Sequence, residues 1–115
     1  MLILFLLILW PAAVWADEFT SLSGDVALSG AELTEMTAGR ALEFYEGGVS
    51  LYSVGGAYSY TYPNNGGTAF GQFTVGEDEI CIAYRNGHSR CDRFVRSHGR
   101  LVMLAQDGQR FAIRP

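Results

Sequence analysis

The only two cysteines of the chain, Cys81 and Cys91, flank a short segment with an Asn-Gly pair and a histidine, ICIAYRNGHSRCD. With His88 and His98 they give four residues of the types that bind zinc, spaced C-x6-H-x2-C-x6-H. This spacing matches no common zinc finger, and the two histidines are expected at opposite ends of one strand, about 20–30 Å apart. A redox-active pair needs close spacing, such as C-x-x-C at a helix start. We therefore predict a structural disulfide and no metal site.

The loop between the cysteines decides whether they face each other. Taken as a three-residue hairpin loop, residues 85–87 end in Gly87, which adopts the left-handed conformation of such a loop without steric cost. This register places Cys81 opposite Cys91 at a non-hydrogen-bonded pair, where Cα atoms lie about 4.5 Å apart. A two-residue Asn-Gly loop would instead place Cys81 opposite Asp92. The disulfide therefore requires the three-residue register.

A row of phenols is the first candidate binding feature. Tyr58, Tyr60 and Tyr62 alternate with small residues in the stretch AYSYTY, so one strand carries all three rings on one face. A row of rigid aromatic rings offers a large contact area at low entropic cost, as a binding platform does. The alternative is that the same face forms the interior, because the opposite face is small and polar. Both interpretations stay open at this point.

The second candidate is a group of arginines around the cysteine hairpin, of which we select Arg90 and Arg93 as binding residues. The planar guanidinium group grips carboxylates and phosphates with two parallel hydrogen bonds. The alternative is that the arginines pair with the acidic first part of the domain. Residues 17–79 carry ten acids and one Arg, whereas residues 80–115 carry two acids and seven Arg. The arginines of the group are Arg85, Arg90, Arg93, Arg96 and Arg100.

Catalytic signatures are missing from the sequence. It contains none of the motifs G-x-S-x-G, H-E-x-x-H, G-x-x-x-x-G-K or G-x-G-x-x-G. The acidic cluster at residues 77–79 lacks the ordered alternation of a calcium loop and is typical of a solvated turn. We predict no catalytic residue and no cofactor. A net charge of −4 argues against a nucleic-acid partner, because such affinity rests on a positive field.

The amino terminus has the pattern of a secretory signal peptide. Residues 2–10 are apolar without interruption, and small residues at Val14 and Ala16 fit a cleavage site after Ala16. The apolar run is shorter than the about 20 residues of a membrane span. No Lys or Arg precedes it, so an uncleaved anchor is the alternative. We expect a signal peptide at 1–16, a single domain at 17–115 with no stable membrane span after cleavage, and a periplasmic or secreted protein.

The rest of the chain predicts one short helix followed by strands. Ser29 and Glu32 form a capping-box pattern, and Gly39 suits the left-handed residue that ends a helix, so a helix is expected over about residues 30–38. Short connections make consecutive strands antiparallel. A meander of eight strands hides its apolar face by curling into a small barrel. The expected strands are 41–46, 49–54, 57–62, 69–75, 79–84, 89–96, 100–105 and 109–114.

This layout resembles small exported bacterial β-proteins with one disulfide, some of which carry the label dihydrodipicolinate reductase. The resemblance rests on the leader, the capped helix, residues 39–42, residues 71–75 and the cysteine hairpin, with Phe73 where that pattern usually shows Trp. The label implies a nucleotide cofactor. The sequence has no βαβ unit or phosphate loop to hold one, so we do not transfer the activity. The plan is also similar to small periplasmic protease and lysozyme inhibitors, which are stapled β-barrels.

From these features we expect an exported, non-catalytic binding or interaction protein with an inhibitor-like plan. Its partner would be an envelope or extracellular protein or a small ligand. The alternative is a small periplasmic enzyme or ligand carrier with a site inside the barrel, which needs polar groups that face an internal cavity.

Overall fold

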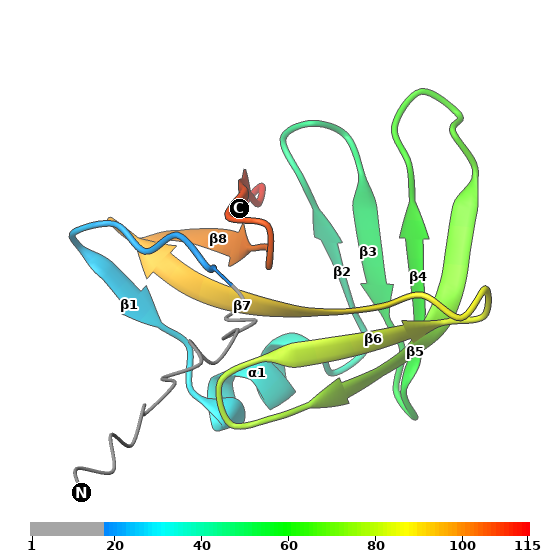
Figure 1. Cartoon of the computed structure of the whole chain (residues 1–115), viewed down its shortest axis with the longest axis horizontal. Helices are drawn as coiled ribbons and strands as arrows, with labels where there is room; N and C mark the ends of the chain where they lie inside the picture. Colours follow the sequence, from blue (N-terminus) through cyan, green and yellow to red (C-terminus); the bar gives the residue numbers. More distant parts are fainter. Residues whose placement is uncertain (1–17) are drawn as a thin grey trace, which may run out of the picture.

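The structure is a computed structural model that describes residues 18–115. The predicted signal peptide lies outside the described residues. The fold is mainly β, as predicted: an antiparallel sheet curls into a half-barrel, and one short helix lies beside it (Figure 1). The elements are β1 (Asp25–Ala27), α1 (Gly30–Met36), β2 (Arg40–Glu43), β3 (Val49–Tyr52), β4 (Ala57–Thr61), β5 (Thr68–Val75), β6 (Ile80–Tyr84), β7 (Ser89–Ser97), β8 (Arg100–Leu104) and β9 (Arg110–Ala112).

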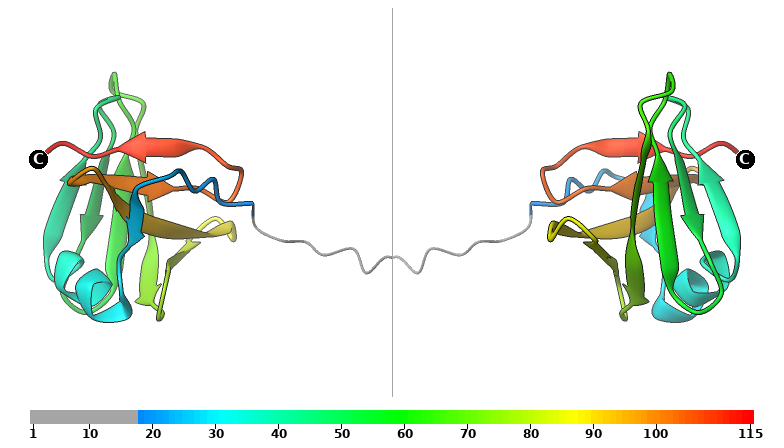
Figure 2. Two further views of the ribbon diagram at one scale, coloured as in Figure 1. Left: turned by 90° about the vertical axis from the view of Figure 1, so that its left-hand side faces the viewer. Right: turned by 90° about the vertical axis from the view of Figure 1, so that its right-hand side faces the viewer.

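The strands from β2 to β9 pair in chain order, as short connections dictate. The long strand β7 joins two parts of this sheet: residues 89–92 pair with β6, and residues 93–97 pair with β8. Figure 2 shows β7 to β9 crossing the upright strands β2 to β5. An isolated bridge between Phe44 and Ile113 links the two ends of the sheet, and the Arg114 amide donates to the Glu43 carbonyl at 2.7 Å. The half-barrel is therefore joined along part of its seam.

The helix is shorter than expected but begins as predicted. The Ser29 side chain accepts a bond from the Glu32 amide, and the Glu32 carboxylate accepts one from the Ser29 amide, so the capping box is confirmed. Leu33 and Met36 are buried in the main core, which they share with inward residues of the sheet. Gly39 has φ +68° and turns the chain into β2. The helix thus covers one end of the half-barrel (Figure 1).

A ninth strand, β1, was not predicted. It pairs antiparallel with the second half of β7, with Asp25 opposite Ser97. Its anchor is a partly buried ion pair in which both terminal nitrogens of Arg110 donate to the Asp25 carboxylate, at 2.7 and 3.1 Å. The segment DVA is too short to show the alternation that marks a strand, so its pairing comes from this tertiary contact.

Candidate binding site

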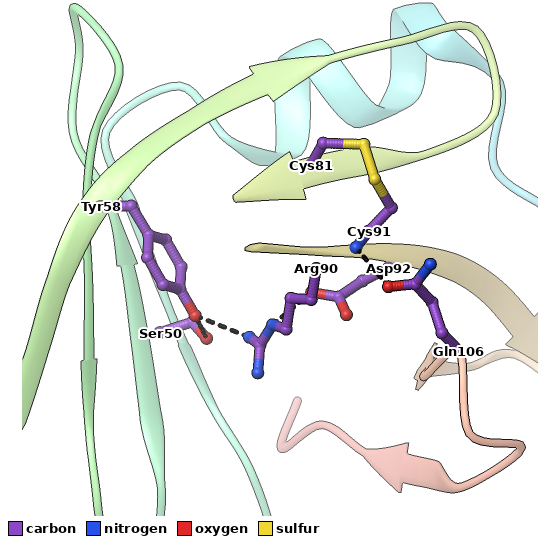
Figure 3. A network of polar contacts seen from close by, with 7 residues as sticks. All are labelled: Ser50, Tyr58, Cys81, Arg90, Cys91, Asp92 and Gln106. Atoms are coloured by element: carbon purple, nitrogen blue, oxygen red, sulfur yellow. Dashed lines mark hydrogen bonds and ion pairs between the residues drawn. A yellow bond between two sulfur atoms is a disulfide. The ribbon is translucent and has the colours of Figure 1, made fainter. Parts of the chain in front are cut away.

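The cysteine hairpin has the predicted register. Cys81 pairs with Cys91 in a disulfide, their Cα atoms lie 4.0 Å apart, and Gly87 has φ +91° in the connecting loop. Because this is a non-hydrogen-bonded pair, the Cys91 amide points away from β6 and donates to Gln106 Oε1 at 2.9 Å (Figure 3). The disulfide indicates an oxidising, non-cytoplasmic environment.

The hairpin carries an ion pair on its inner face. Arg90 stands opposite Ile82 and Asp92 opposite Ile80, and both isoleucines are in the core. Asp92 is 1% exposed, and Arg90 Nε lies 3.3 Å from Asp92 Oδ2 without hydrogen-bond geometry. A carboxylate this deeply buried needs a partner charge, because isolated burial is costly. Arg90, whose side chain is 32% exposed, lies beside Asp92 and supplies that charge (Figure 3).

Burial shifts the ionisation of this pair. It raises the pKa of Asp92 to about 6, and the neighbouring Arg90 guanidinium offsets part of the effect. Burial alone would lower the pKa of Arg90, but the negative charge of Asp92 and then the nearby phenols raise it. Arg90 is therefore charged at neutral pH, whereas Asp92 changes charge in mildly acidic solution.

Tyr58 meets Arg90 inside the half-barrel. Arg90 Nη2 donates to the Tyr58 hydroxyl at 2.9 Å, and the same hydroxyl lies 2.9 Å from Ser50 Oγ (Figure 3). Tyr58 and Ser50 are both buried, at 2% and 0% exposure. Burial raises the pKa of the Tyr58 phenol, which therefore stays neutral and available as a hydrogen-bond partner. The polar atoms of three strands thus fix one end of the Arg90 side chain.

The phenol row runs from the interior to the surface. Tyr58 is buried, Tyr60 is half-buried, and Tyr62 is 50% exposed and packs edge-on against Tyr60. The Arg90 guanidinium lies 5.9 Å from the centre of the Tyr60 ring and 5.7 Å from that of Tyr84. These distances are typical of cation–π contacts. We call Tyr58, Tyr60, Tyr62, Tyr84 and Arg90 the barrel mouth.

Two glycines lie beside the rings of the barrel mouth, and one of them, Gly48, makes room for Tyr60. A side chain at Gly48 would collide with the Tyr60 hydroxyl, so its absence lets this ring lie over the β2–β3 turn. Gly71 stands between Tyr58 and Tyr84 in one cross-strand row, and the two rings meet across it with centroids 6.0 Å apart. The Tyr60 hydroxyl also donates to Glu46 Oε1 at 3.3 Å, from the same turn as Gly48.

Of the five predicted binding residues, the structure brings four together and places Arg93 elsewhere. Arg93 lies on the outer face of β7, because it is an odd number of residues from Arg90. Its guanidinium lies 3.6 Å from Asp78 Oδ2 and 4.5 Å from the centre of the Phe19 ring. Arg93 thus pairs with an acid of the first part of the domain, as the alternative interpretation of the arginines expected.

Sequence reasoning did not find Asp92, Ser50 and Tyr84. The hairpin register could have identified Asp92. It places Asp92 opposite the inward Ile80 and two residues after Arg90, so both charged side chains point to the same face. Ser50 and Tyr84 lie on strands whose facing partners the sequence does not reveal.

The zinc alternative considered for the cysteine hairpin needs free thiolates as ligands. Cys81 and Cys91 cannot supply them, because they are bonded to each other.

The barrel mouth is suited to binding. It presents an exposed ring, two half-buried rings and a charged guanidinium whose position is held from inside. Tyrosine and arginine are the residue types that concentrate at the energetic centres of interfaces.

Between residues 18 and 115, no helix is long and apolar enough to cross a membrane. Comparisons of the chain with protein-family models, curated proteins and solved structures found no match.

Proposed function

We propose that the protein is an exported, non-catalytic binding protein that holds a partner at the barrel mouth. The observation that carries this proposal is the fixed position of Arg90. It is bonded to Tyr58, paired with Asp92 and flanked by the rings of Tyr60 and Tyr84. A recognition group held in place before binding loses little entropy on association.

The disulfide supports an inhibitor-like role for the same surface. Cys91 directly follows Arg90, so the disulfide holds together the two strands, β6 and β7, that carry the guanidinium. Rigid recognition elements of this kind gain affinity because their bound conformation is already formed. The partner is an envelope or extracellular protein, with the exposed Tyr62 ring at the rim of the contact.

A second candidate function is a ligand carrier, or a small enzyme, with a site that opens into the half-barrel. The observation that favours it is a cavity of about 730 Å³ in the wall of the half-barrel, lined in part by Arg40, Leu42 and Arg96. This volume is within the range of small-molecule sites, about 300–1,000 Å³. The cavity shares no residue with the barrel mouth.

Affinity capture from an envelope extract tests the leading proposal. Three baits are compared: the wild type, Arg90→Gln/Asp92→Asn, and Arg93→Gln. The double substitution removes both charges of the ion pair together, so that no unpaired carboxylate remains inside. The matched control removes a guanidinium from the same strand on the opposite face. Thermal unfolding of each bait checks that it is folded.

We expect a partner that the wild type and the Arg93 variant recover equally and that the Arg90/Asp92 variant loses. The same partner on all three baits would remove the barrel mouth from the interaction. A partner lost only from the Arg93 variant would move the interface to the outer face of β7. If none of the folded baits captures a partner, the proposal has no support from this experiment.

A further inference from the structure

The wall of the half-barrel is incomplete on one side. The Phe44–Ile113 bridge joins β2 to the end of β9, but residues 40–42 of β2 lie beyond that bridge. The cavity of about 730 Å³ lies there, between β2, the start of β8 and helix α1. We call this cavity the wall gap.

The floor of the wall gap is apolar. Leu28, Met36, Leu42 and Ile113 belong to the main core, and Leu101 packs against it. Core side chains that are 3–8% exposed therefore form the floor of the gap. An apolar chain laid over this floor would exchange contact with water for contact with the core side chains.

The rim of the wall gap is charged, and two of its arginines have partners. Arg96 Nη1 donates to Glu32 Oε2 at 2.6 Å, and Arg114 Nε lies 3.6 Å from Glu43 Oε1. These two pairs balance their own charges. One pair joins helix α1 to β7, and the other joins β2 to the end of the chain after β9.

Two further arginines of the rim, Arg40 and Arg100, make no ion pair or side-chain hydrogen bond among residues 18–115. Of the acidic residues that line the gap, Glu35 is the one whose side chain likewise has no ion pair or hydrogen bond among residues 18–115. Two unpaired guanidinium groups against one unpaired side-chain carboxylate favour an anion at the rim.

We propose that the wall gap binds a carboxylate that carries an acyl chain. The carboxylate contacts Arg40 and Arg100, and the chain lies over Met36, Leu42 and Leu101. This inference develops the second candidate function. It does not depend on the barrel mouth, because the two sites have no lining residue in common.

Titration with monomeric dodecanoate tests the proposal. The protein is used in the form that the cells produce, and the fatty acid is kept below its micelle concentration. Calorimetry gives the affinity, and methyl NMR locates the chain. We expect one molecule per protein, with shifts at Met36, Leu42 and Leu101. Acetate, which has the head group alone, and dodecyltrimethylammonium, which has the opposite charge, should bind far more weakly.

Three exposed variants then assign the head group. Arg40→Gln/Arg100→Gln should weaken dodecanoate binding about tenfold, which corresponds to two modest charge contacts. Glu35→Gln should strengthen it, because the opposing carboxylate is gone. Arg85→Gln, an exposed arginine that does not line the gap, should leave it unchanged.

Absence of dodecanoate binding to the folded wild type would overturn the proposal. Equal binding of the cationic amphiphile would overturn the anionic head group, and equal binding by the Arg40/Arg100 variant would overturn the site. An added peptide that protects the Ala41 amide from hydrogen exchange, without any dodecanoate binding, would show that the gap is a strand-pairing edge instead. None of these outcomes bears on capture at the barrel mouth.

Discussion

At the scale of single residues, Asp92 is the group whose charge state matters most to the interior. Its carboxylate is 1% exposed and balanced by Arg90, which is itself partly open to solvent. The Tyr52 hydroxyl, also buried, has no hydrogen-bond partner among the described residues, and burial raises its pKa. The core therefore tolerates an ionised carboxylate only because one guanidinium reaches in from the barrel mouth.

The first prediction is a pH dependence of stability that belongs to Asp92. Its pKa is about 6 in the folded protein and near 3.8 in the unfolded chain, so folding favours the protonated form. The contribution of Asp92 to stability is fully present below pH 3.8 and is lost as the pH rises through 6. Relative to Asp92→Asn, the wild type should lose on the order of 2–3 kcal/mol between pH 4 and pH 7. Urea unfolding of both proteins at each pH measures this difference.

Other carboxyl groups act in the opposite direction. Hydrogen bonds from Arg110 and Arg96 lower the pKa values of Asp25 and Glu32, so their contributions are lost as the pH falls. Both groups are present in the wild type and in Asp92→Asn, and the comparison cancels them. A wild-type-to-variant difference that stays constant from pH 4 to pH 7 would show that Asp92 has no raised pKa.

The second prediction concerns Gly48. In Gly48→Ala the new methyl group occupies the place of the Tyr60 hydroxyl, so the ring must move away from Glu46. We expect shifted Tyr60 ring signals by NMR and reduced partner capture, with little loss of stability. Gly76→Ala is the matched control, because its methyl group would make an ordinary contact with Glu79. Unchanged Tyr60 signals in Gly48→Ala would contradict the close packing of the barrel mouth.

At the scale of elements, the disulfide stabilises one hairpin. Replacing both cysteines, Cys81→Ser/Cys91→Ser, frees a short loop and should cost about 3 kcal/mol of unfolding free energy in the chain-entropy model. The far-UV circular dichroism should keep its β signal, because β6 and β7 remain paired by their backbones. Chemical unfolding with and without the bond measures the change. Equal stability would show that the disulfide does not stabilise the fold, and complete loss of the β signal would show that the strands need it to pair.

The elements that local sequence determines were predictable. The capping box fixed the helix start, and the loop that ends in Gly87 fixed the pairing of Cys81 with Cys91. Strand β1 was not predictable in this way, because its three residues are held by the Asp25–Arg110 ion pair with a distant strand. The helix ends at Met36 rather than at residue 38, because the backbone of Thr37, with φ −97° and ψ 8°, has left the helical conformation and forms the C-cap.

At the scale of the whole molecule, the candidate site was predictable in part. The alternation of Tyr58, Tyr60 and Tyr62 placed the rings on one face, and parity separates Arg90 from Arg93. The meeting of Arg90 with Tyr58 depends on how the sheet curls, which brings β7 across β4. The wall gap depends on the same closure, because it exists only where β2 and β8 separate. The alternation of residues along a strand does not predict how strongly the sheet curves.

Export is a further prediction for the whole molecule. The apolar run of residues 2–10 and the small residues before Asp17 predict cleavage after Ala16. The disulfide agrees with an oxidising compartment. Intact-mass analysis of the protein from periplasm and medium should give the mass of residues 17–115. A mass that includes residues 1–16 would refute the predicted cleavage.

Docking of the partner at the barrel mouth can be tested by site-specific photocrosslinking in living cells. A photoreactive phenylalanine replaces Tyr62, which is 50% exposed after β4, or Val54, which is 85% exposed before β4. The two positions lie at opposite ends of that strand. If the partner docks at the barrel mouth, position 62 should give a discrete adduct and position 54 should give none. An adduct from position 54 alone would contradict docking there.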